Sequence, residues 1–330
     1  MIEFSPATVP TMYFIGVSTR QSSIMRVFPL WADALGHADT VIQGIDCPLH
    51  ADPEEYRAIV RFIQNDPLSL GALVTTHKID LFNACENLFD EIDPYAMQLR
   101  EVSGIYKSGS KLCACAKDPI SSGLALQAFV PHNFWSAHGG EVLLLGAGGS
   151  SLAMSLYLTS KGHGTDTPRV ITITNRSVAR LASAKAMLSS LNPNVEFRFI
   201  PCPPPADNDN LVSGLPPFSL VVNATGLGKD APGSPITDHA IFQMDSLVWE
   251  INYRGDLLFQ TQAKAQAVSH HLHVEDGWTY FIHGWTQVIG EVLHVPMGKE
   301  TIVHLSKLAQ AQQTSALTQN KTASPIDPLK

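Results

Sequence analysis

A run of glycines follows an apolar strand and precedes a helix in the middle of the chain. In EVLLLGAGGSSLAMSLYL the glycines occupy positions 146, 148 and 149. Gly146 permits a tight turn, and Gly148 lets the backbone approach a pyrophosphate. The helix start offers free N–H groups and the positive end of its dipole to the anion. Ser151 replaces the usual third glycine and is small enough for close packing. This setting predicts a nucleotide site, whereas glycines alone would also fit an empty structural turn.

The end of the next strand, VITITNRS, bears on which nucleotide is bound. An NAD site usually places an acidic residue there to bind the ribose 2′-hydroxyl. Here the strand ends in Asn175 and Arg176, so no carboxylate is offered. Arg176, and Arg180 one turn later, can stack on adenine and pair with a 2′-phosphate. The sequence therefore favours NADP over NAD; the alternative is that Arg176 caps a surface turn.

Strands and helices that would position these residues alternate along most of the chain. Apolar spacing predicts strands over residues 11–18, 39–48, 70–78 and 111–118, and helices over residues 22–36, 52–66, 88–106 and 119–135. Further on we expect two strands around a polar surface loop within residues 195–225, a strand, loop and helix over residues 246–266, and an apolar helix over residues 278–293. This alternation predicts an α/β fold, and 330 residues suggest two domains.

Composition excludes several classes of function. A net charge of −8 leaves no basic field for nucleic acid or an anionic membrane surface. The N-terminal stretch does not resemble a signal peptide, and no run of roughly eighteen apolar residues predicts a membrane span. We therefore expect a cytosolic protein without nucleic-acid or membrane partners. The five cysteines include no CxxC pair, so we expect buried free thiols and no metal site.

Several segments, in order, resemble motifs of the shikimate dehydrogenase family. LVTTHKIDLF is similar to the family's NVTxPHK loop, and KLCACAKDPISSG stands where the family has a strand ending in NTDxxG. NRS, VVNATGLG and EINYRGDLLF resemble its NRT, NATxxG and DxxYxPxxT segments. DGWTYFIHGWTQVI resembles its closing helix, DGxxMLxxQ. Order and spacing agree over about residues 12–295.

The resemblance implies a two-domain enzyme with its active site in the cleft between the domains. Residues 1–118 would form a substrate-binding and catalytic domain closed by a helix over residues 276–295, and residues 119–275 a Rossmann-type NADP-binding domain. The polar residues 314–330 are expected to be a disordered tail. The reaction implied is reversible hydride transfer between NADP and a ring hydroxyl of a polyhydroxylated cyclic acid. The implied cofactor-binding residues are Gly146, Gly148, Gly149, Ser150, Asn175, Arg176, Ser177, Arg180, Asn223, Thr225 and Gly277.

Two residues match the family's catalytic pair, Lys78 and Asp118. Removing hydride from an alcohol carbon requires the hydroxyl proton to leave as well, and a lysine can take or return that proton. A carboxylate across the cleft can accept a hydrogen bond from the same hydroxyl and hold it in place. Tyr253 matches a pocket tyrosine, and Ser22 matches the second serine of the family's SxSP carboxylate-binding turn.

Much of the family's substrate-binding set has changed. Arg20 replaces the first serine of the carboxylate-binding turn, and Ser103 the asparagine of VNT. Gly284 stands at the closing-helix glutamine. The loop threonine is matched by Val74 without a gap, or by Thr75 with a one-residue shift. An unpaired polar group in a site costs about 1–3 kcal/mol. We therefore expect a different substrate, still cyclic or small and hydroxylated, bulkier because Gly284 vacates space, with Arg20 available to a carboxylate.

Three functions remain open from the sequence. The first is an NADP-dependent oxidoreductase acting on a relative of shikimate. The second is a true shikimate or quinate dehydrogenase with rearranged binding groups. The third is a ligand-sensing protein without turnover, against which the retention of Lys78 and Asp118 argues. The architecture fits a monomer or a homodimer.

Overall fold

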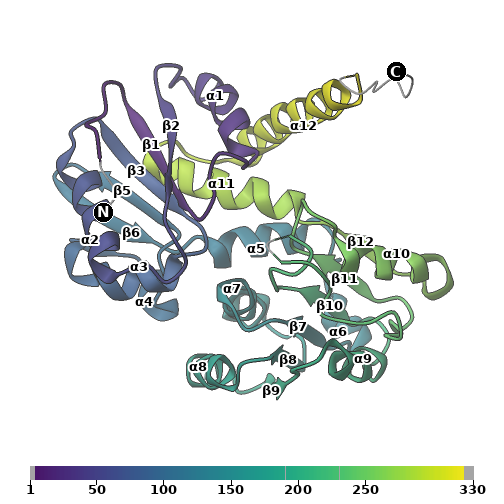
Figure 1. The fold of residues 1–330 in the computed structure, drawn as a ribbon. Helices are drawn as coiled ribbons and strands as arrows, with labels where there is room; N and C mark the ends of the chain where they lie inside the picture. The colour runs from purple at the N-terminus through teal and green to yellow at the C-terminus, as the bar shows by residue number, and fades with distance from the viewer. Residues whose placement is uncertain (1–3, 190, 230, 323–330) are drawn as a thin grey trace, which may run out of the picture. The chain divides into compact units, whose positions relative to one another are not determined.

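The chain folds into two compact units. Unit 1 comprises residues 1–117 and 285–330, and unit 2 comprises residues 118–284. The computed structural model describes residues 4–189, 191–229 and 231–322. Each unit contains a sheet flanked by helices (Figure 1), so the predicted α/β class is confirmed.

Unit 1 is built on a sheet whose described strands run in the order β2-β1-β3-β5-β6-β4, with β5 antiparallel to both its neighbours. These strands are β1 (Thr11–Gly16), β2 (Val41–Asp46), β3 (Ser69–Val74), β4 (Glu91–Ile92), β5 (Gly104–Ser108) and β6 (Lys111–Cys115). The helical elements are α1 (Ile24–Ala34), α2 (Pro53–Asn65), α3 (Lys78–Cys85), η1 (Glu86–Leu88), α4 (Pro94–Leu99), the second half of α11 (Trp278–Val292) and α12 (Lys299–Thr322).

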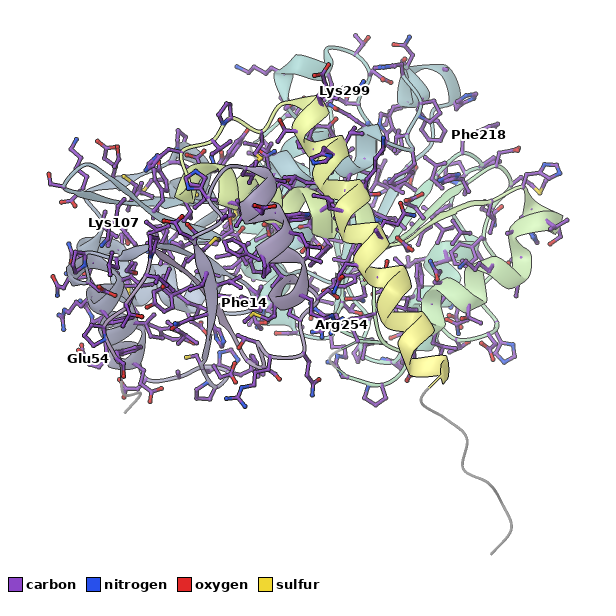
Figure 2. All side chains as sticks on the ribbon, turned by 90° about the horizontal axis from the view of Figure 1, so that it is seen from above. Phe14, Glu54, Lys107, Phe218, Arg254 and Lys299 are labelled. Atoms are coloured by element: carbon purple, nitrogen blue, oxygen red, sulfur yellow. The ribbon has the colours of Figure 1, made fainter. Side chains whose placement is uncertain are left out.

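Strand β1 of unit 1 is buried on both of its faces. Along β1, Tyr13 and Ile15 belong to the core that includes α2 and α3. Phe14, labelled in Figure 2, points to the other face and packs edge-on against Trp285 of α11, with the ring centroids 5.0 Å apart. This alternation follows the two-residue period of a strand.

Unit 2 has a parallel sheet whose described strands run in the order β12-β11-β10-β7-β8-β9. The strands are β7 (Val142–Leu145), β8 (Val170–Asn175), β9 (Glu196–Pro201), β10 (Leu220–Asn223), β11 (Leu247–Glu250) and β12 (His273–Glu275). The helical elements are α5 (Asp118–Gln127), α6 (Phe134–His138), α7 (Gly149–Leu158), η2 (Lys161–His163), α8 (Val178–Leu188), α9 (Pro205–Ser213), α10 (Leu258–His270) and the first half of α11. The strand order reverses between β7 and β10, and parallel sheets bind ligands at the carboxyl ends of strands at such a point.

Two of the predicted helices are shorter than expected. The helix expected over residues 88–106 is confined to α4, and β4 and β5 lie on either side of it. Asp93 starts α4 by accepting a hydrogen bond from the Ala96 N–H at 2.6 Å, and Arg100 ends it in the left-handed conformation, with φ of 49°. The helix expected over residues 119–135 ends at Gln127, before Pro131.

The polar segment predicted as a surface loop between β9 and β10 contains helix α9. Two of its polar side chains, Asn208 and Asp209, are buried and hold a neighbouring loop. Asn208 donates to the Pro235 carbonyl at 2.8 Å, and Asp209 accepts from the Thr237 N–H at 2.8 Å. Tertiary contacts have thus turned a loop-like composition into a helix.

The C-terminal region also differs from its prediction. Helix α12 continues through Thr322, so the part of the expected disordered tail up to that residue is helical. The stretch contains no glycine, and its first proline is Pro325, so nothing breaks the helix earlier. The rest of the predicted tail lies outside the described residues.

Two further observations concern the whole described chain. All five cysteines are buried and free, which confirms the expectation for the thiols. None of the described helices is long and apolar enough to cross a membrane.

Candidate functional site

The glycine turn after β7 has the geometry of a tight strand-to-helix connection. Gly146 has a φ of 115°, and a Cβ there would lie 2.7 Å from the Ala224 carbonyl oxygen. Ser151, fully buried, donates its hydroxyl to the Gly146 carbonyl at 2.6 Å. The serine at the usual third glycine position therefore closes the turn.

The space beside the Gly148 Cα is open, whereas the space beside the Gly146 Cα is crowded. It precedes the first residue of α7, Gly149, in an extended conformation with φ of −95°. A Cβ at Gly148 would meet no heavy atom within 4 Å. Ser150 follows in the first turn of α7 and lies 3.5 Å from the Tyr280 hydroxyl. The backbone and the start of α7 are thus accessible to an anion.

The turn after β8 leaves two arginines exposed. Asn175 accepts a hydrogen bond from the Ser177 N–H at 2.8 Å, and Ser177 accepts one from the Arg180 N–H at 3.3 Å. Ser177, not Arg176, therefore caps this turn and α8. Arg176 and Arg180 are exposed, and neither guanidinium pairs with a carboxylate among the described residues. Both are available to a negatively charged group.

A buried polar network joins the ends of β10 and β11. Asn223 and Glu250 are each fully buried, and the Asn223 amide donates to the Glu250 carboxylate at 2.6 Å. Thr225 donates its hydroxyl to Asn223 Oδ1 at 2.6 Å, and Asn252 donates its side-chain amide to Glu250 at 2.7 Å. Burial raises the pKa of the Glu250 carboxyl to about 7, against the effect of its hydrogen-bond donors. Glu250 was not among the residues predicted from the sequence, although it stands at the end of β11.

Gly277 and Gly284 have opposite surroundings. A Cβ at Gly277 would lie 2.0 Å from the Ile251 carbonyl oxygen, so packing within the chain already requires glycine there. A Cβ at Gly284 would meet nothing within 4 Å. Tyr253 is half-buried, and its ring lies 4.5 Å from that of Phe281. The backbone at Gly284 would therefore accept a side chain without a clash.

In unit 1 the turn between β3 and α3 carries Lys78 as the first residue of α3. Thr75 anchors the turn, because both its N–H, at 3.1 Å, and its hydroxyl, at 3.2 Å, donate to the Ile15 carbonyl. His77 is buried, and its Nδ1 lies 3.0 Å from the Tyr56 hydroxyl. Burial lowers the pKa of His77, which favours a neutral ring. These contacts fix the backbone from which Lys78 projects.

Ser103 is placed as a structural brace. It is 3% exposed, and its hydroxyl accepts a hydrogen bond from the Lys117 N–H at 2.7 Å. Its carbonyl accepts from the Val74 N–H at 2.9 Å, while the Val102 N–H donates to the Lys78 carbonyl at 3.1 Å. Residues 102–103 therefore connect the Lys78 turn to the residue that precedes Asp118.

Replacing Ser103 tests this brace. Ser103→Ala should lower the free energy of unfolding by about 1–3 kcal/mol, because the part-buried Lys117 N–H loses its acceptor. Urea unfolding measures the effect, with the exposed Ser18→Ala as the control. Unchanged stability would instead leave Ser103 free to serve a ligand.

The remaining predicted residues are Arg20, Ser22 and Asp118. Arg20 is exposed in the turn after β1, and Ser22 is 6% exposed just before α1. Asp118 is 6% exposed at the start of α5, where its carbonyl accepts from the Ser122 hydroxyl at 2.7 Å. Lys78 belongs to unit 1 and Asp118 to unit 2. Among the described residues, no group of three His, Cys, Asp or Glu side chains could hold a metal ion.

The sequence is similar to curated bacterial enzymes. No family model matches the chain. It is 24% identical over 248 residues to a shikimate dehydrogenase (NADP(+)) of Methylocella silvestris, covering 75% of this chain and 78% of that protein. It is 26% identical over 219 residues to a shikimate dehydrogenase (NADP(+)) of Symbiobacterium thermophilum, covering 65% of this chain and 68% of that protein.

Solved structures with different substrates in their names share the fold. A Thermus thermophilus shikimate 5-dehydrogenase in complex with NADP(H) and shikimate has a TM-score of 0.66 at 19% identity, covering 91% of this chain and 99% of that one. A Corynebacterium glutamicum quinate dehydrogenase in complex with NAD has a TM-score of 0.67 at 18% identity, covering 91% of this chain and 98% of that one. A Gluconobacter 5-ketofructose reductase has a TM-score of 0.64 at 16% identity, covering 90% of this chain and 97% of that one.

The fold and the glycine turn define a two-unit α/β protein with a dinucleotide-type unit. The curated relatives then confirm the resemblance to shikimate dehydrogenases that the motifs indicated. Their low identity marks this chain as a divergent relative.

Proposed function

We propose that this protein is an NADP-dependent oxidoreductase of the shikimate dehydrogenase kind. It transfers hydride reversibly between NADP and a ring hydroxyl of a cyclic hydroxy acid or polyol. The observation that carries this proposal is the open backbone at Gly148, at the start of α7 and at the reversal of strand order in unit 2. The curated relatives are named as NADP(+) enzymes, which supports the same cofactor here.

The residues of unit 2 fit NADP better than NAD. The pyrophosphate would lie over Gly148 and Gly149, where the N–H groups of α7 face an anion. The exposed guanidiniums of Arg176 and Arg180 would pair with the 2′-phosphate. When bound, the nicotinamide supplies the hydride acceptor or donor.

Lys78 and Asp118 have separate tasks in the proposed reaction. Lys78 would take the hydroxyl proton during oxidation and return it during reduction, as a general base and acid. Asp118 would accept a hydrogen bond from the same hydroxyl and hold it in place. The hydrogen bonds of Thr75 and Val102 hold the Lys78 backbone, so its side chain extends from one fixed position.

The proposed substrate is related to shikimate but different from it. Ser103 uses its hydroxyl on the Lys117 backbone, and Arg20 offers an exposed cation where the family has a serine. The empty space beside Gly284 would admit a larger group. Oxidation of shikimate or quinate is the second candidate, favoured by the names of the relatives. A ligand sensor without turnover is the third candidate. A sensor has no need of a proton-transfer pair, so it does not explain the presence of Lys78 and Asp118.

The test is a substrate panel of cyclic polyols and hydroxy acids that includes shikimate and quinate. NADP+ and NAD+ reduction would be followed in parallel by absorbance of the reduced nicotinamide. We expect turnover that prefers NADP+ with a member other than shikimate. Efficient turnover of shikimate would support the second candidate, and silence across the panel with NADP+ binding intact would favour the sensor.

A further inference from the structure

The loop that follows β10 lies against the glycine turn that follows β7. β7 and β10 are the two strands between which the strand order of unit 2 reverses. The Ala224 carbonyl oxygen lies 2.7 Å from the position that a Cβ of Gly146 would occupy. Loop Asn223–Gly228 and the turn at Gly146 therefore meet at the place where parallel sheets bind their ligands.

This loop lies on the side of the site away from the adenosine. With Arg176 and Arg180 after β8 holding the 2′-phosphate and the pyrophosphate over Gly148, the other half of a dinucleotide must extend toward β10. The groups that loop Asn223–Gly228 presents would then meet the nicotinamide half. The hydrogen bonds that hold this loop in place would therefore affect cofactor binding.

The Glu250 carboxylate fixes the orientation of Asn223. An ionised carboxylate only accepts hydrogen bonds, so the Asn223 side chain must turn its NH2 toward it, at 2.6 Å. Asn223 Oδ1 then faces Thr225 and accepts from its N–H at 3.0 Å and from its hydroxyl at 2.6 Å. The charge on Glu250 thereby sets the direction of every hydrogen bond along this chain of groups.

Asn252 ties the same carboxylate to the loop from the other side. Its N–H and side-chain NH2 donate to Glu250 Oε1 at 2.9 and 2.7 Å. The same NH2 also lies 3.3 Å from the Thr225 carbonyl and 3.4 Å from the Leu227 carbonyl. Glu250 is fully buried, so water cannot replace these partners.

We propose that Glu250 is a positioning residue of the cofactor site, whose ionised carboxylate orients Asn223 and Asn252 so that loop Asn223–Gly228 presents fixed hydrogen-bonding groups to the nicotinamide half of NADP. The proposal rests on the proposed function and deepens it, because it adds a residue that controls cofactor affinity. Glu250 acts through its neighbours and touches neither substrate nor cofactor.

The role predicts a pH dependence of cofactor binding. Protonated Glu250 becomes a donor at one oxygen and releases the constraint on Asn223. Burial raises the pKa of Glu250 to about 7, so the ordered arrangement strengthens as the pH rises through neutrality. The turn at residues 146–151 has no ionisable side chain. Among the described residues that end or follow β10, β11 and β12, the other ionisable side chains are Lys229, Tyr253, Arg254, Asp256, Glu275 and Asp276. The charge of Lys229 acts against the rise in the pKa of Glu250.

The experiment is titration calorimetry of the whole protein with NADP+ from about pH 6 to about pH 9. Wild type is compared with Glu250→Gln, which removes the charge at nearly constant size. Asp209→Asn is the matched control, because Asp209 is also a buried carboxylate of unit 2 that accepts a backbone N–H at 2.8 Å, but it braces α9. The 2′-phosphate titrates equally in all three proteins, so its contribution cancels in the comparison.

We expect Glu250→Gln to weaken NADP+ binding about tenfold at the upper end of the range and to approach wild type at the lower end. Asp209→Asn should follow wild type throughout. Equal binding by Glu250→Gln and wild type at every pH would overturn the role of Glu250 alone. An equal loss in Asp209→Asn would also overturn it, as general destabilisation. A wild type that binds no NADP+ would refute the proposed function itself.

Glu250→Asp keeps the test decisive if Glu250→Gln does not fold. Aspartate retains the charge but is one methylene shorter, so it cannot reach Asn223 and Asn252 together. We expect weaker NADP+ binding that still tightens with rising pH. Wild-type affinity in this variant would contradict the proposal.

Discussion

Gly148→Ala is expected to abolish tight NADP+ binding while leaving the fold unchanged. The residue has φ of −95° and ψ of −176°, an extended conformation that alanine adopts without strain. Its Cβ would meet no atom of the protein within 4 Å, so the methyl group would collide only with a bound pyrophosphate. We expect affinity for NADP+ to fall roughly 10- to 100-fold, or about 1.4–2.7 kcal/mol, by calorimetry.

Gly146→Ala is the matched control, with the opposite signature. Gly146 has φ of 115°, and its Cβ would lie 2.7 Å from the Ala224 carbonyl oxygen. This variant should lower the free energy of unfolding by about 1–3 kcal/mol, measured in urea. Gly148→Ala should unfold like wild type. If Gly148→Ala bound NADP+ normally, the pyrophosphate would not lie over this turn.

The glycine turn could be predicted because its signal is local. An apolar strand, glycines at fixed spacing and a helix occur within eighteen residues, 141–158. The physical needs of that turn, a positive φ at Gly146 and an open backbone at Gly148, depend on the same short stretch. The exposed Arg176 was likewise visible from its place at a strand end. For such features, sequence and structure carry the same information.

Glu250 and Ser103 could not be assigned in the same way. The partner of Glu250, Asn223, lies 27 residues earlier in the chain, and nothing near either residue indicates the pairing. The motif position of Ser103 predicts a substrate ligand, whereas its hydroxyl accepts a hydrogen bond from the Lys117 N–H, 14 residues away. Hydrogen bonds between distant strand ends follow from the tertiary fold and leave no periodic trace in the sequence.

The errors in secondary structure have the same origin. In α9 the polar residues Asn208 and Asp209 are buried against residues 234–239, so a composition typical of an exposed loop forms a helix. The long helix predicted over residues 88–106 does not form, because a helix of six residues begins after Asp93 and ends before Arg100. In both cases contacts of single side chains outweighed the propensity of the segment.

Lys78→Ala should remove the chemical step while preserving the binding of NADP+. If Lys78 moves the hydroxyl proton, its loss should lower kcat by about 100- to 10,000-fold, the usual contribution of general acid–base catalysis. Alanine suits the first position of α3, so the helix should persist. Steady-state kinetics with the substrate identified by the panel, and calorimetry with NADP+, measure the two effects separately.

Lys111→Ala is the control for Lys78→Ala within the same unit. Lys111 has a side chain that is 56% exposed and pairs with Glu91 at the surface, so its removal should change neither kcat nor cofactor affinity. The decisive comparison is the kcat of each variant divided by the kcat of wild type, measured at several pH values. Because Lys78 would act as the proton acceptor, Lys78→Ala should regain part of its rate from small amines in solution, and Lys111→Ala should not respond. If Lys78→Ala retained wild-type kcat, another group would transfer the proton. The similarity of LVTTHKIDLF to the family loop would then reflect a shared fold and not a shared catalytic role.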